Sequence, residues 1–218
     1  MGKGLGAMSD SFLTSASGFI LAGGASSRMG TDKALLELGG VPLLVRAARL
    51  VESLLGSATV IGPPEKYARL WPRVVADQTA GLGPVGGLVT ALAISTSKWN
   101  LILACDLPYL TLAWLRYLLG RAEQSTADVV LPFSADSAGR LHPEPLCAVY
   151  HRRCLLPVRR AIQAGVRKMT DALKGCTVEA VEAAAWKPFD SYGGLFKNIN
   201  SPDDYAEVQA RWERSAAQ

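Results

Sequence analysis

The sequence has few of the residues that build metal centres and disulfide frameworks. Only two histidines, His142 and His151, occur in 218 residues, so a histidine-based metal centre has little to draw on. The four cysteines form no C-x-x-C pair and lie in or beside apolar runs, which is typical of buried thiols in a reducing compartment. They are Cys105, Cys147, Cys154 and Cys176. We therefore expect a cytoplasmic protein without disulfides or a zinc site.

Charge and long apolar runs are also scarce. Charged residues make up 19% of the chain, the formal net charge is +4, and the Lys and Arg residues are scattered along the sequence. The chain thus lacks the electrostatic footprint of a nucleic-acid-binding protein. No apolar run approaches the roughly 18 residues needed to cross a membrane. We expect a soluble protein that binds neither nucleic acid nor a membrane, although a small anionic ligand needs only a local cluster of cations.

The amino-terminal segment, residues 1–17, is rich in Gly and Ser and has no continuous apolar core of the kind found in signal peptides. We expect it to be a flexible extension. Apolar residues make up 49% of the chain, which is enough for a sizeable core. No repeat, low-complexity tract or linker divides residues 18–218, so they are expected to form a single domain.

What the sequence does contain is an alternation of two kinds of apolar segment. Short runs such as "GFILA", "ATVIG", "PRVVA" and "NLILACD" alternate with longer segments such as "PLLVRAARLVESLL" and "LAWLRYLLGRAE". The short runs are continuously apolar, which indicates strands covered on both faces by helices. The pattern predicts the doubly wound α/β class. After "ADVVLPF", the segment "SADSAGRLHPEP" is expected to be a polar turn, and the closing helix to begin near Pro202.

A glycine-containing loop follows the first predicted strand, in "FILAGGASSRMGTDKALL". Gly23 and Gly24 permit positive φ angles and the close approach of a ligand, so backbone N–H groups can face phosphate oxygens. Arg28 and Lys33 would neutralise the phosphate charge. The loop lacks the G-K-[ST] of a P-loop and the G-x-G-x-x-G of a dinucleotide-binding turn. An ordinary glycine turn beside surface cations is therefore the alternative.

Two aspartates are expected at one edge of the sheet. Asp106 follows a buried strand in "NLILACDLPYL", and Asp77 follows another strand, before a glycine-rich turn that leads into a helix. The carboxyl ends of strands face the ligand crevice in open α/β sheets, and carboxylates hold Mg²⁺ together with substrate phosphates and waters. The alternatives are helix capping by Asp106, for which Thr111 is the better candidate, and a simple turn role for Asp77.

Near the carboxyl terminus, "FKNINSPDDY" places Asn198 and Asn200 two residues apart on a predicted strand. Both side chains then share one face, where amides suit a polar substrate. The residues from Ser201 to Asp204 have the pattern of a helix start, with a cap, a proline and negative charge. Arg167 and Lys168 follow a helix stop and are interpreted as an exposed basic rim, with a second phosphate site as the alternative.

Together these motifs closely resemble those of the MobA-like nucleotidyltransferases, the molybdenum cofactor guanylyltransferase family. The likeness extends from Gly18 to Val208 and rests on "LAGGASSRMGTDKALL", "GLGPVGGLVTAL", "CDLPYLT", "HPEPLCAVYHRRCLLPVRRAIQAGVRK" and "NINSPDDY", in the family's order. It implies a Rossmann-like, three-layer α/β/α fold with a mostly parallel central sheet. It also implies transfer of GMP from GTP to the phosphate of molybdenum-bound molybdopterin, with release of pyrophosphate.

The resemblance further implies a role for each motif. Asn198 and Asn200 match an asparagine pair tied to the pterin substrate or to activity, and Asp106 would bind Mg²⁺ as well as nucleotide. In catalysis, Lys33 and Arg28 would stabilise charge on the α-phosphate and the leaving pyrophosphate, with Asp106 holding the metal. With Gly24 from the loop, the predicted nucleotide-binding residues are Leu21, Ala22, Gly23, Gly24, Lys33, Asp77 and Asp106. GTP, molybdopterin and maturation proteins of molybdoenzymes are the implied partners.

One departure from the family pattern concerns base recognition. Family members often carry an asparagine after the second strand, where this chain has "VIGPPEKY", so a base or ribose contact is lost there or comes from backbone. Two alternatives to the guanylyltransferase hypothesis remain. One is a CTP- or sugar-phosphate-using nucleotidyltransferase of the same fold, and the other is a non-catalytic nucleotide- or cofactor-binding module.

Overall fold

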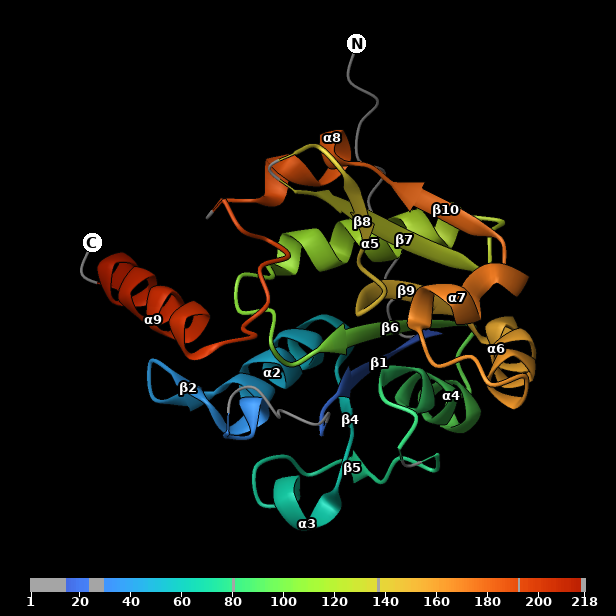
Figure 1. Cartoon of the computed structure of the whole chain (residues 1–218), viewed down its shortest axis with the longest axis horizontal. Helices are drawn as coiled ribbons and strands as arrows, with labels where there is room; N and C mark the ends of the chain where they lie inside the picture. The colour runs from blue at the N-terminus through green and yellow to red at the C-terminus, as the bar shows by residue number, and fades with distance from the viewer. Residues whose placement is uncertain (1–14, 24–29, 80, 137, 192, 217–218) are drawn as a thin grey trace.

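The computed structural model describes residues 15–23, 30–79, 81–136, 138–191 and 193–216. Its strands and their bounds are β1 (Ala16–Leu21), β2 (Glu37–Leu38), β3 (Val41–Pro42), β4 (Thr59–Ile61), β5 (Val74–Val75), β6 (Trp99–Ala104), β7 (Val129–Ala135), β8 (Leu141–Pro143), β9 (Cys147–His151) and β10 (Val178–Val181). The main sheet has the order β10-β7-β9-β6-β1-β4-β5, with β8 paired to β7, while β2 and β3 form a separate hairpin (Figure 1). All pairs along β10–β7 and β6–β1–β4–β5 are parallel, and β9 runs antiparallel between β6 and β7.

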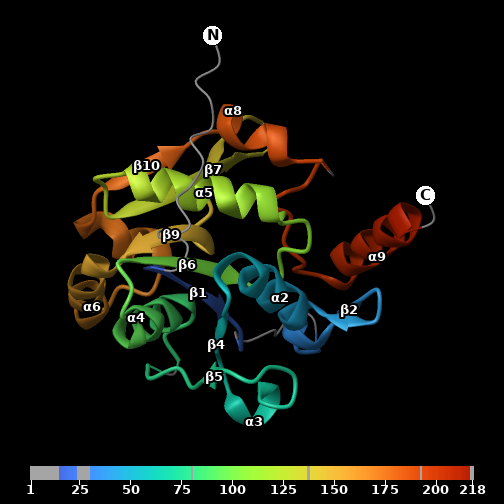
Figure 2. The same ribbon diagram turned by 180° about the vertical axis from the view of Figure 1, so that it is seen from behind.

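Helices cover both faces of this sheet (Figures 1 and 2). The helices are α2 (Leu43–Leu55), α3 (Pro64–Tyr67), α4 (Pro84–Ile94), α5 (Leu112–Gln124), α6 (Leu155–Gln163), α7 (Met169–Ala172), α8 (Ala183–Trp186) and α9 (Pro202–Ala216), with 3-10 turns η1 (Lys33–Leu35), η2 (Arg152–Cys154), η3 (Leu173–Gly175) and η4 (Lys187–Phe189). In β1, Ile20 packs into the core shared with α2 and α5, whereas Phe19 packs into the core shared with α4 and α6. The strands are continuously apolar because they serve two cores, so the predicted three-layer α/β fold with a mostly parallel sheet is confirmed.

Local sequence signals set the helix ends near the site. Thr111, and not Asp106, caps α5, because its Oγ1 accepts a hydrogen bond from the backbone N–H of Trp114 at 3.2 Å. Helix α4 begins with Pro84 after Gly83, whose φ of 62° and ψ of −152° are open essentially only to glycine. Asp77 thus lies two residues after the end of β5, and Asp106 lies two residues after the end of β6. Neither aspartate is the N-cap of the helix that follows it.

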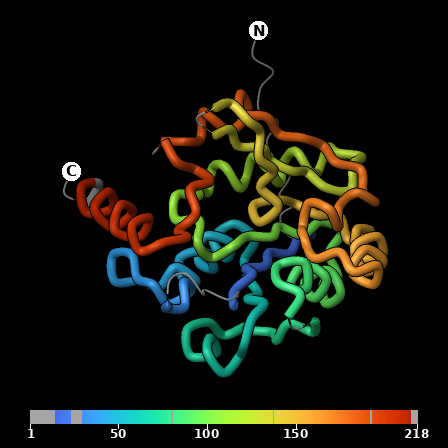
Figure 3. Tube along the Cα trace, viewed as in Figure 1, coloured from blue at the N-terminus to red at the C-terminus, as the bar shows by residue number. Residues whose placement is uncertain are grey.

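The carboxyl-terminal helix α9 lies against the amino-terminal part of the chain, beside the β2–β3 hairpin, as the tube view shows (Figure 3). The Tyr205 hydroxyl donates to the Glu37 carbonyl oxygen, and the Arg46 guanidinium lies 3.9 Å from the centroid of the Trp212 ring. Ser201 Oγ accepts from the N–H of Asp204 at 3.1 Å, which confirms the predicted helix start at Pro202. The packing brings the segment before α9 to η1, where Asn200 contacts Lys33.

Two sequence-based expectations about local structure are wrong. The segment expected to be a polar turn continues β7 to Ala135 and includes β8, with Ser134 opposite His142; its polar side chains are tolerated because this hairpin is largely exposed. Asn198 and Asn200 do not lie on a strand. A backbone hydrogen bond from the N–H of Ile199 to the Asp106 carbonyl at 3.2 Å ties that segment to the residues after β6. The two asparagines are nevertheless both exposed, with buried Ile199 between them.

Further expectations concern the chain start, the thiols and membrane spans. Strand β1 begins at Ala16, because Ala16 pairs with Trp99 of β6, so regular structure starts two residues before the expected boundary at 18. All four cysteines are free thiols, and three of them are buried. Within the described residues, no helix has the length and apolar character required to cross a membrane.

Candidate active site

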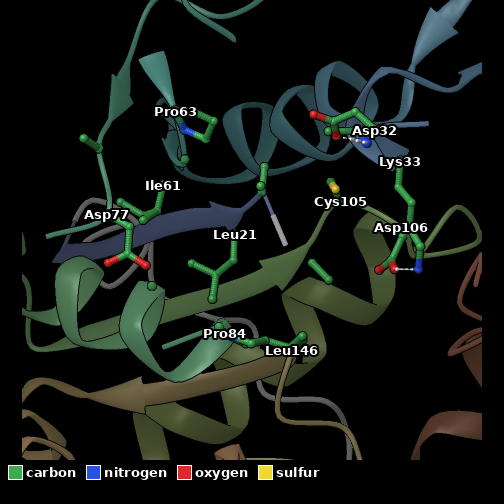
Figure 4. A pocket seen from close by; sticks show the side chains of 18 of the residues that line it. Leu21, Asp32, Lys33, Ile61, Pro63, Asp77, Pro84, Cys105, Asp106 and Leu146 are labelled. Atoms are coloured by element: carbon green, nitrogen blue, oxygen red, sulfur yellow. Dashed lines mark hydrogen bonds and ion pairs between the residues drawn. The ribbon is translucent and has the colours of Figure 1, made fainter. Parts of the chain in front are cut away.

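A pocket of about 740 Å³ opens where β1, β4, β5 and β6 end, at the carboxyl edge of the sheet. Its walls come from the residues that follow these strands, including Ala22, Gly62, Asp77 and Asp106. Asp77 lies at one end of the pocket, and Lys33 and Asp106 lie at the other (Figure 4). The predicted crevice therefore exists and collects residues from four strand ends.

The first wall is backbone from the end of β1. Leu21, Ala22 and Gly23 line the pocket, and the Ala22 N–H donates to the Ile61 carbonyl at 2.9 Å. Gly23 has a φ of 98°, and a Cβ at this position would lie 2.8 Å from Cδ of Pro63, so both its conformation and its contact require glycine. The predicted residues Gly24 and Arg28 lie outside the described residues.

Lys33, Asp106 and Asn200 meet at one end of the pocket. The Lys33 Nζ lies 3.3 Å from Asp106 Oδ2 and donates to Asn200 Oδ1 at 2.7 Å. The Lys33 and Asp106 side chains are each about one-fifth exposed. The ammonium is thus held between a charged and a neutral acceptor, in contact with a cavity large enough for a nucleotide. Such a pre-positioned cation is suited to binding phosphate oxygens.

Asn200 is held in place by the start of α9. The Asp204 Oδ2 accepts the backbone N–H groups of Asn200 at 3.0 Å and of Ser201 at 2.9 Å. Hydrogen bonds from the Asn200 backbone and then from the Ser201 side chain lower the pKa of Asp204 below its usual range, so the carboxylate stays ionised as an acceptor. The structure brings Asn200 to Lys33. Both asparagines are exposed, and neither is among the residues that line the pocket.

Asp77 lines the other end of the pocket and organises the turn around it. Its Oδ1 accepts from the N–H of Thr79 at 2.9 Å, from Thr79 Oγ1 at 3.0 Å and from Thr90 Oγ1 at 2.7 Å. A Cβ on Gly86 would lie 3.0 Å from Asp77 Oδ2, which explains the small residue there. Asp77 Oδ1 is therefore engaged in hydrogen bonds within the protein. The nucleotide contact predicted for Asp77 stays a prediction.

The charge of the described pocket lining is negative. The described lining contains one ammonium, that of Lys33, and four carboxylates, those of Asp32, Glu65, Asp77 and Asp106. A polyphosphate needs further positive charge in such a site. Among the described residues, no group of three His, Cys, Asp or Glu side chains could hold a metal ion by itself. A single carboxylate beside bound phosphates does fit Mg²⁺, which takes few protein ligands and keeps substrate oxygens and waters.

One predicted pair of residues lies outside the pocket, and three residues that line it were not predicted. Arg167 and Lys168 are exposed and do not line the pocket, in agreement with a basic rim. Pro63, Pro64 and Leu146 line it without having been singled out as site residues. The prolines come just after β4, separated from it by Gly62, and could have been found from that position, whereas Leu146 carries no recognisable signal in the sequence.

Comparison with known proteins identifies the family of this chain. Residues 18–177 match the model of the MobA-like NTP transferase domain. The chain belongs to the MobA-like NTP transferase family. A probable molybdenum cofactor guanylyltransferase of Chloroflexus aggregans is 34% identical over 201 residues, which cover 89% of this chain and 93% of that protein. The molybdenum cofactor guanylyltransferase of Pseudomonas aeruginosa is 33% identical over 200 residues, 90% of this chain and 96% of that protein.

Solved structures agree with the family assignment at the level of the fold. The molybdopterin-guanine dinucleotide biosynthesis protein A of Archaeoglobus fulgidus has a TM-score of 0.76 at 24% identity, covering 93% of this chain and all of that chain. With the family model and the curated relatives, this MobA-like chain is a nucleotidyltransferase.

Proposed function

We propose that this nucleotidyltransferase transfers GMP from GTP to the terminal phosphate of molybdenum-bound molybdopterin. An oxygen of the acceptor phosphate forms a bond to the α-phosphorus of GTP, the bond from that phosphorus to the bridging oxygen breaks, and pyrophosphate leaves. The product is the guanine dinucleotide form of the cofactor. The observation that carries the proposal is the meeting of Lys33, Asp106 and Asn200 at one end of a nucleotide-sized pocket, in a chain whose curated relatives are named for guanylyl transfer.

In this reaction the protein supplies position and charge. The acceptor phosphate is ionised near neutral pH, so no strong general base is needed, and holding the two phosphates in line carries much of the rate. We assign the base and ribose to the end of the pocket near Gly62 and Asp77, and the triphosphate to the end near Lys33; all three residues line the pocket. Lys33 donates hydrogen bonds to phosphate oxygens on which charge grows as pyrophosphate departs. Asn200 accepts a hydrogen bond from Lys33, and we assign it to the acceptor.

Asp106 is the residue that we assign to Mg²⁺. When bound, the ion polarises phosphate oxygens and neutralises part of their charge. A bound cation is needed because the described pocket lining has four carboxylates and only one ammonium to balance the charge of a triphosphate. Arg28, which lies in the same signature as Lys33, is assigned to the leaving pyrophosphate.

The proposal includes the setting of the reaction. We assign residues 18–218 to one nucleotidyltransferase domain and the protein to the cytoplasm, where four free cysteines stay reduced. GTP and molybdenum-bound molybdopterin are the substrates. Proteins that mature molybdoenzymes are the partners that would receive the product.

Base selection is tested by incubating the protein with molybdenum-loaded molybdopterin and each of GTP, CTP, ATP and UTP, with and without Mg²⁺. Pyrophosphate release and the mass of the dinucleotide product are measured. We expect product only with GTP and Mg²⁺. Thermal unfolding with the same nucleotides is the binding control, since a ligand at about 100 times its Kd adds about 2.7 kcal/mol of stability. A preference for CTP would replace the guanylyl assignment, and absence of pyrophosphate with every nucleotide would refute transfer.

A further inference from the structure

Asp32, the residue before Lys33, is a carboxylate in a pocket for which we propose a polyanionic ligand, and three donors converge on it. Its Oδ1 accepts from the N–H of Ala34 at 3.2 Å. Its Oδ2 accepts from the Tyr67 hydroxyl at 2.9 Å and from the Lys66 Nζ at 3.3 Å. Lys66 and Tyr67 belong to α3, whose first residue, Pro64, and N-cap residue, Pro63, line the pocket. The contacts therefore join the segment that carries Lys33 to a different wall of the pocket.

Of the two side chains that α3 contributes, Tyr67 is the one placed to fix Asp32. Tyr67 is 0% exposed, whereas the Lys66 side chain is 54% exposed, so its ion pair is screened by solvent. A Cβ on Gly62 would lie 2.9 Å from Cε2 of Tyr67, so the ring abuts the pocket wall while the hydroxyl reaches Asp32. Burial, and then the hydrogen bond to Asp32, raise the pKa of Tyr67, and the hydroxyl keeps its proton as a donor.

The same carboxylate also shapes the backbone of Lys33. Asp32 is the N-cap of η1, with a non-helical φ of −67° and ψ of 112°, and its Oδ1 bonds the second residue of that turn. If Oδ2 lost Tyr67, the carboxylate could rotate, and the bond to the N–H of Ala34 would weaken with it. Lys33, the first residue of η1, would then start from a less defined position. Its long side chain depends on that position to place the ammonium between Asp106 and Asn200.

We infer that Asp32 and Tyr67 are positioning residues for Lys33, joined by the hydrogen bond from the Tyr67 hydroxyl to the Asp32 carboxylate. They hold the start of η1 so that the Lys33 ammonium enters the phosphate end of the pocket in one direction. The inference rests on the proposed function for the role of Lys33. Neither residue is assigned a contact with the reacting atoms.

A double-mutant cycle tests this inference. Tyr67→Phe removes one hydroxyl and keeps the ring against Gly62. In the otherwise unchanged protein it should lower kcat/KM about tenfold, the loss expected for one hydrogen bond to a charged group. In a Lys33→Ala background, the rate is measured by single turnover with excess enzyme. There Tyr67→Phe should change the rate less than about twofold, because Tyr67 influences the substrate only through Lys33. The Kd for GTP, measured by calorimetry, should show the same coupling.

A merely structural role gives a different result. If Tyr67→Phe acted only by loosening the fold, it would lower kcat/KM by the same factor in both backgrounds, and that outcome overturns the inference, as does a wild-type rate in the single variant. Tyr117→Phe is the matched control, since it removes a half-buried hydroxyl that contacts Arg121 on α5, away from the pocket. It should change neither kcat/KM nor the Kd for GTP.

The outcome is separable from that of the proposed function. If the wild-type protein binds a nucleoside triphosphate other than GTP, the cycle is run on the Kd of that nucleotide, and coupling between Tyr67 and Lys33 still supports the positioning role. If GTP is used as proposed but the two changes are independent, the guanylyl assignment stands and the positioning role of Tyr67 is wrong.

Discussion

Replacing Asp204 by Ala should lower activity through a residue that does not line the nucleotide pocket. The Asp204 Oδ2 accepts the N–H of Asn200 at 3.0 Å, and both the N–H and the hydroxyl of Ser201 at 2.9 Å. Asn200 in turn accepts from the Lys33 Nζ at 2.7 Å. Without the carboxylate, the Asn200 backbone is released. Lys33 then loses one of the two acceptors that hold its ammonium.

Two magnitudes follow from these contacts. Loss of one member of the capping arrangement at the start of α9 should cost about 1 kcal/mol of folding free energy, which lowers the Tm by about 2–4 °C in a domain of this size. The Lys33–Asn200 hydrogen bond is charge-assisted but exposed, so it contributes about 1 kcal/mol after solvent screening. Its loss should reduce kcat/KM about fivefold.

The assay pairs pyrophosphate release with thermal unfolding, and Ser201→Ala is the matched control. Ser201 Oγ accepts from the N–H of Asp204 at 3.1 Å, so its removal weakens the same helix cap. It leaves the N–H of Asn200 on the Asp204 carboxylate. Ser201→Ala should therefore lower the Tm by a similar amount and keep kcat/KM within about twofold. If Asp204→Ala lowers the Tm but keeps the wild-type kcat/KM, the proposed route from α9 to Lys33 is refuted.

Three further predictions concern other parts of the molecule. Asp106→Asn should reduce turnover by at least about 10²-fold and remove the Mg²⁺ dependence of nucleotide-induced stabilisation; near-normal turnover would contradict the metal role. Burial opposes the shift, but hydrogen bonds from Thr177 lower the pKa of Asp128 to about 2, so the unfolded state binds more protons and stability should fall as the pH drops from about 4 to about 2. Asp128→Asn should flatten that part of an acid-unfolding curve, and an unchanged slope would disprove the assignment. Iodoacetamide at pH 8 should label Cys176 first, because it is half-buried while the other three thiols are buried, and it should spare Cys105, whose burial and nearby carboxylates raise its pKa. Mass spectrometry of the labelled peptides decides between these sites.

The parts of the fold that sequence predicts well are those fixed by local pattern. Strand β6 is buried at every position, from Trp99 to Ala104, and its apolar run from Leu101 to Ala104 indicates a strand covered on both faces. The helix caps at Thr111 and Ser201 can be predicted from the sequence, because each side chain binds a backbone N–H only three residues further along the chain. The strand ends then place Asp77 and Asp106 at one edge, since parallel strands expose their carboxyl ends together.

What the sequence does not predict depends on contacts between distant segments. Lys33 and Asn200 are 167 positions apart, and their hydrogen bond exists only because α9 packs beside the β2–β3 hairpin. The polar residues of the segment around Asp136 conceal the pairing of β8 with β7, because an exposed hairpin needs no apolar face. Exposed Asn198, buried Ile199 and exposed Asn200 alternate as residues of a strand do, yet this segment pairs with no strand in the described part of the chain.

The three aspartates of the pocket differ in which groups hold them, and this difference explains how a lining rich in carboxylates can serve a polyanion. Asp77 is bound by an amide and two hydroxyl groups, and Asp32 by an amide, a phenol and a lysine on the rim. Both carboxylates therefore already accept hydrogen bonds from within the protein. The only described side-chain partner of Asp106 is Lys33, the very cation assigned to the phosphates. When Lys33 turns to a phosphate, Asp106 is left needing positive charge beside the reacting groups, which is the condition under which a single carboxylate and a triphosphate together recruit a divalent cation.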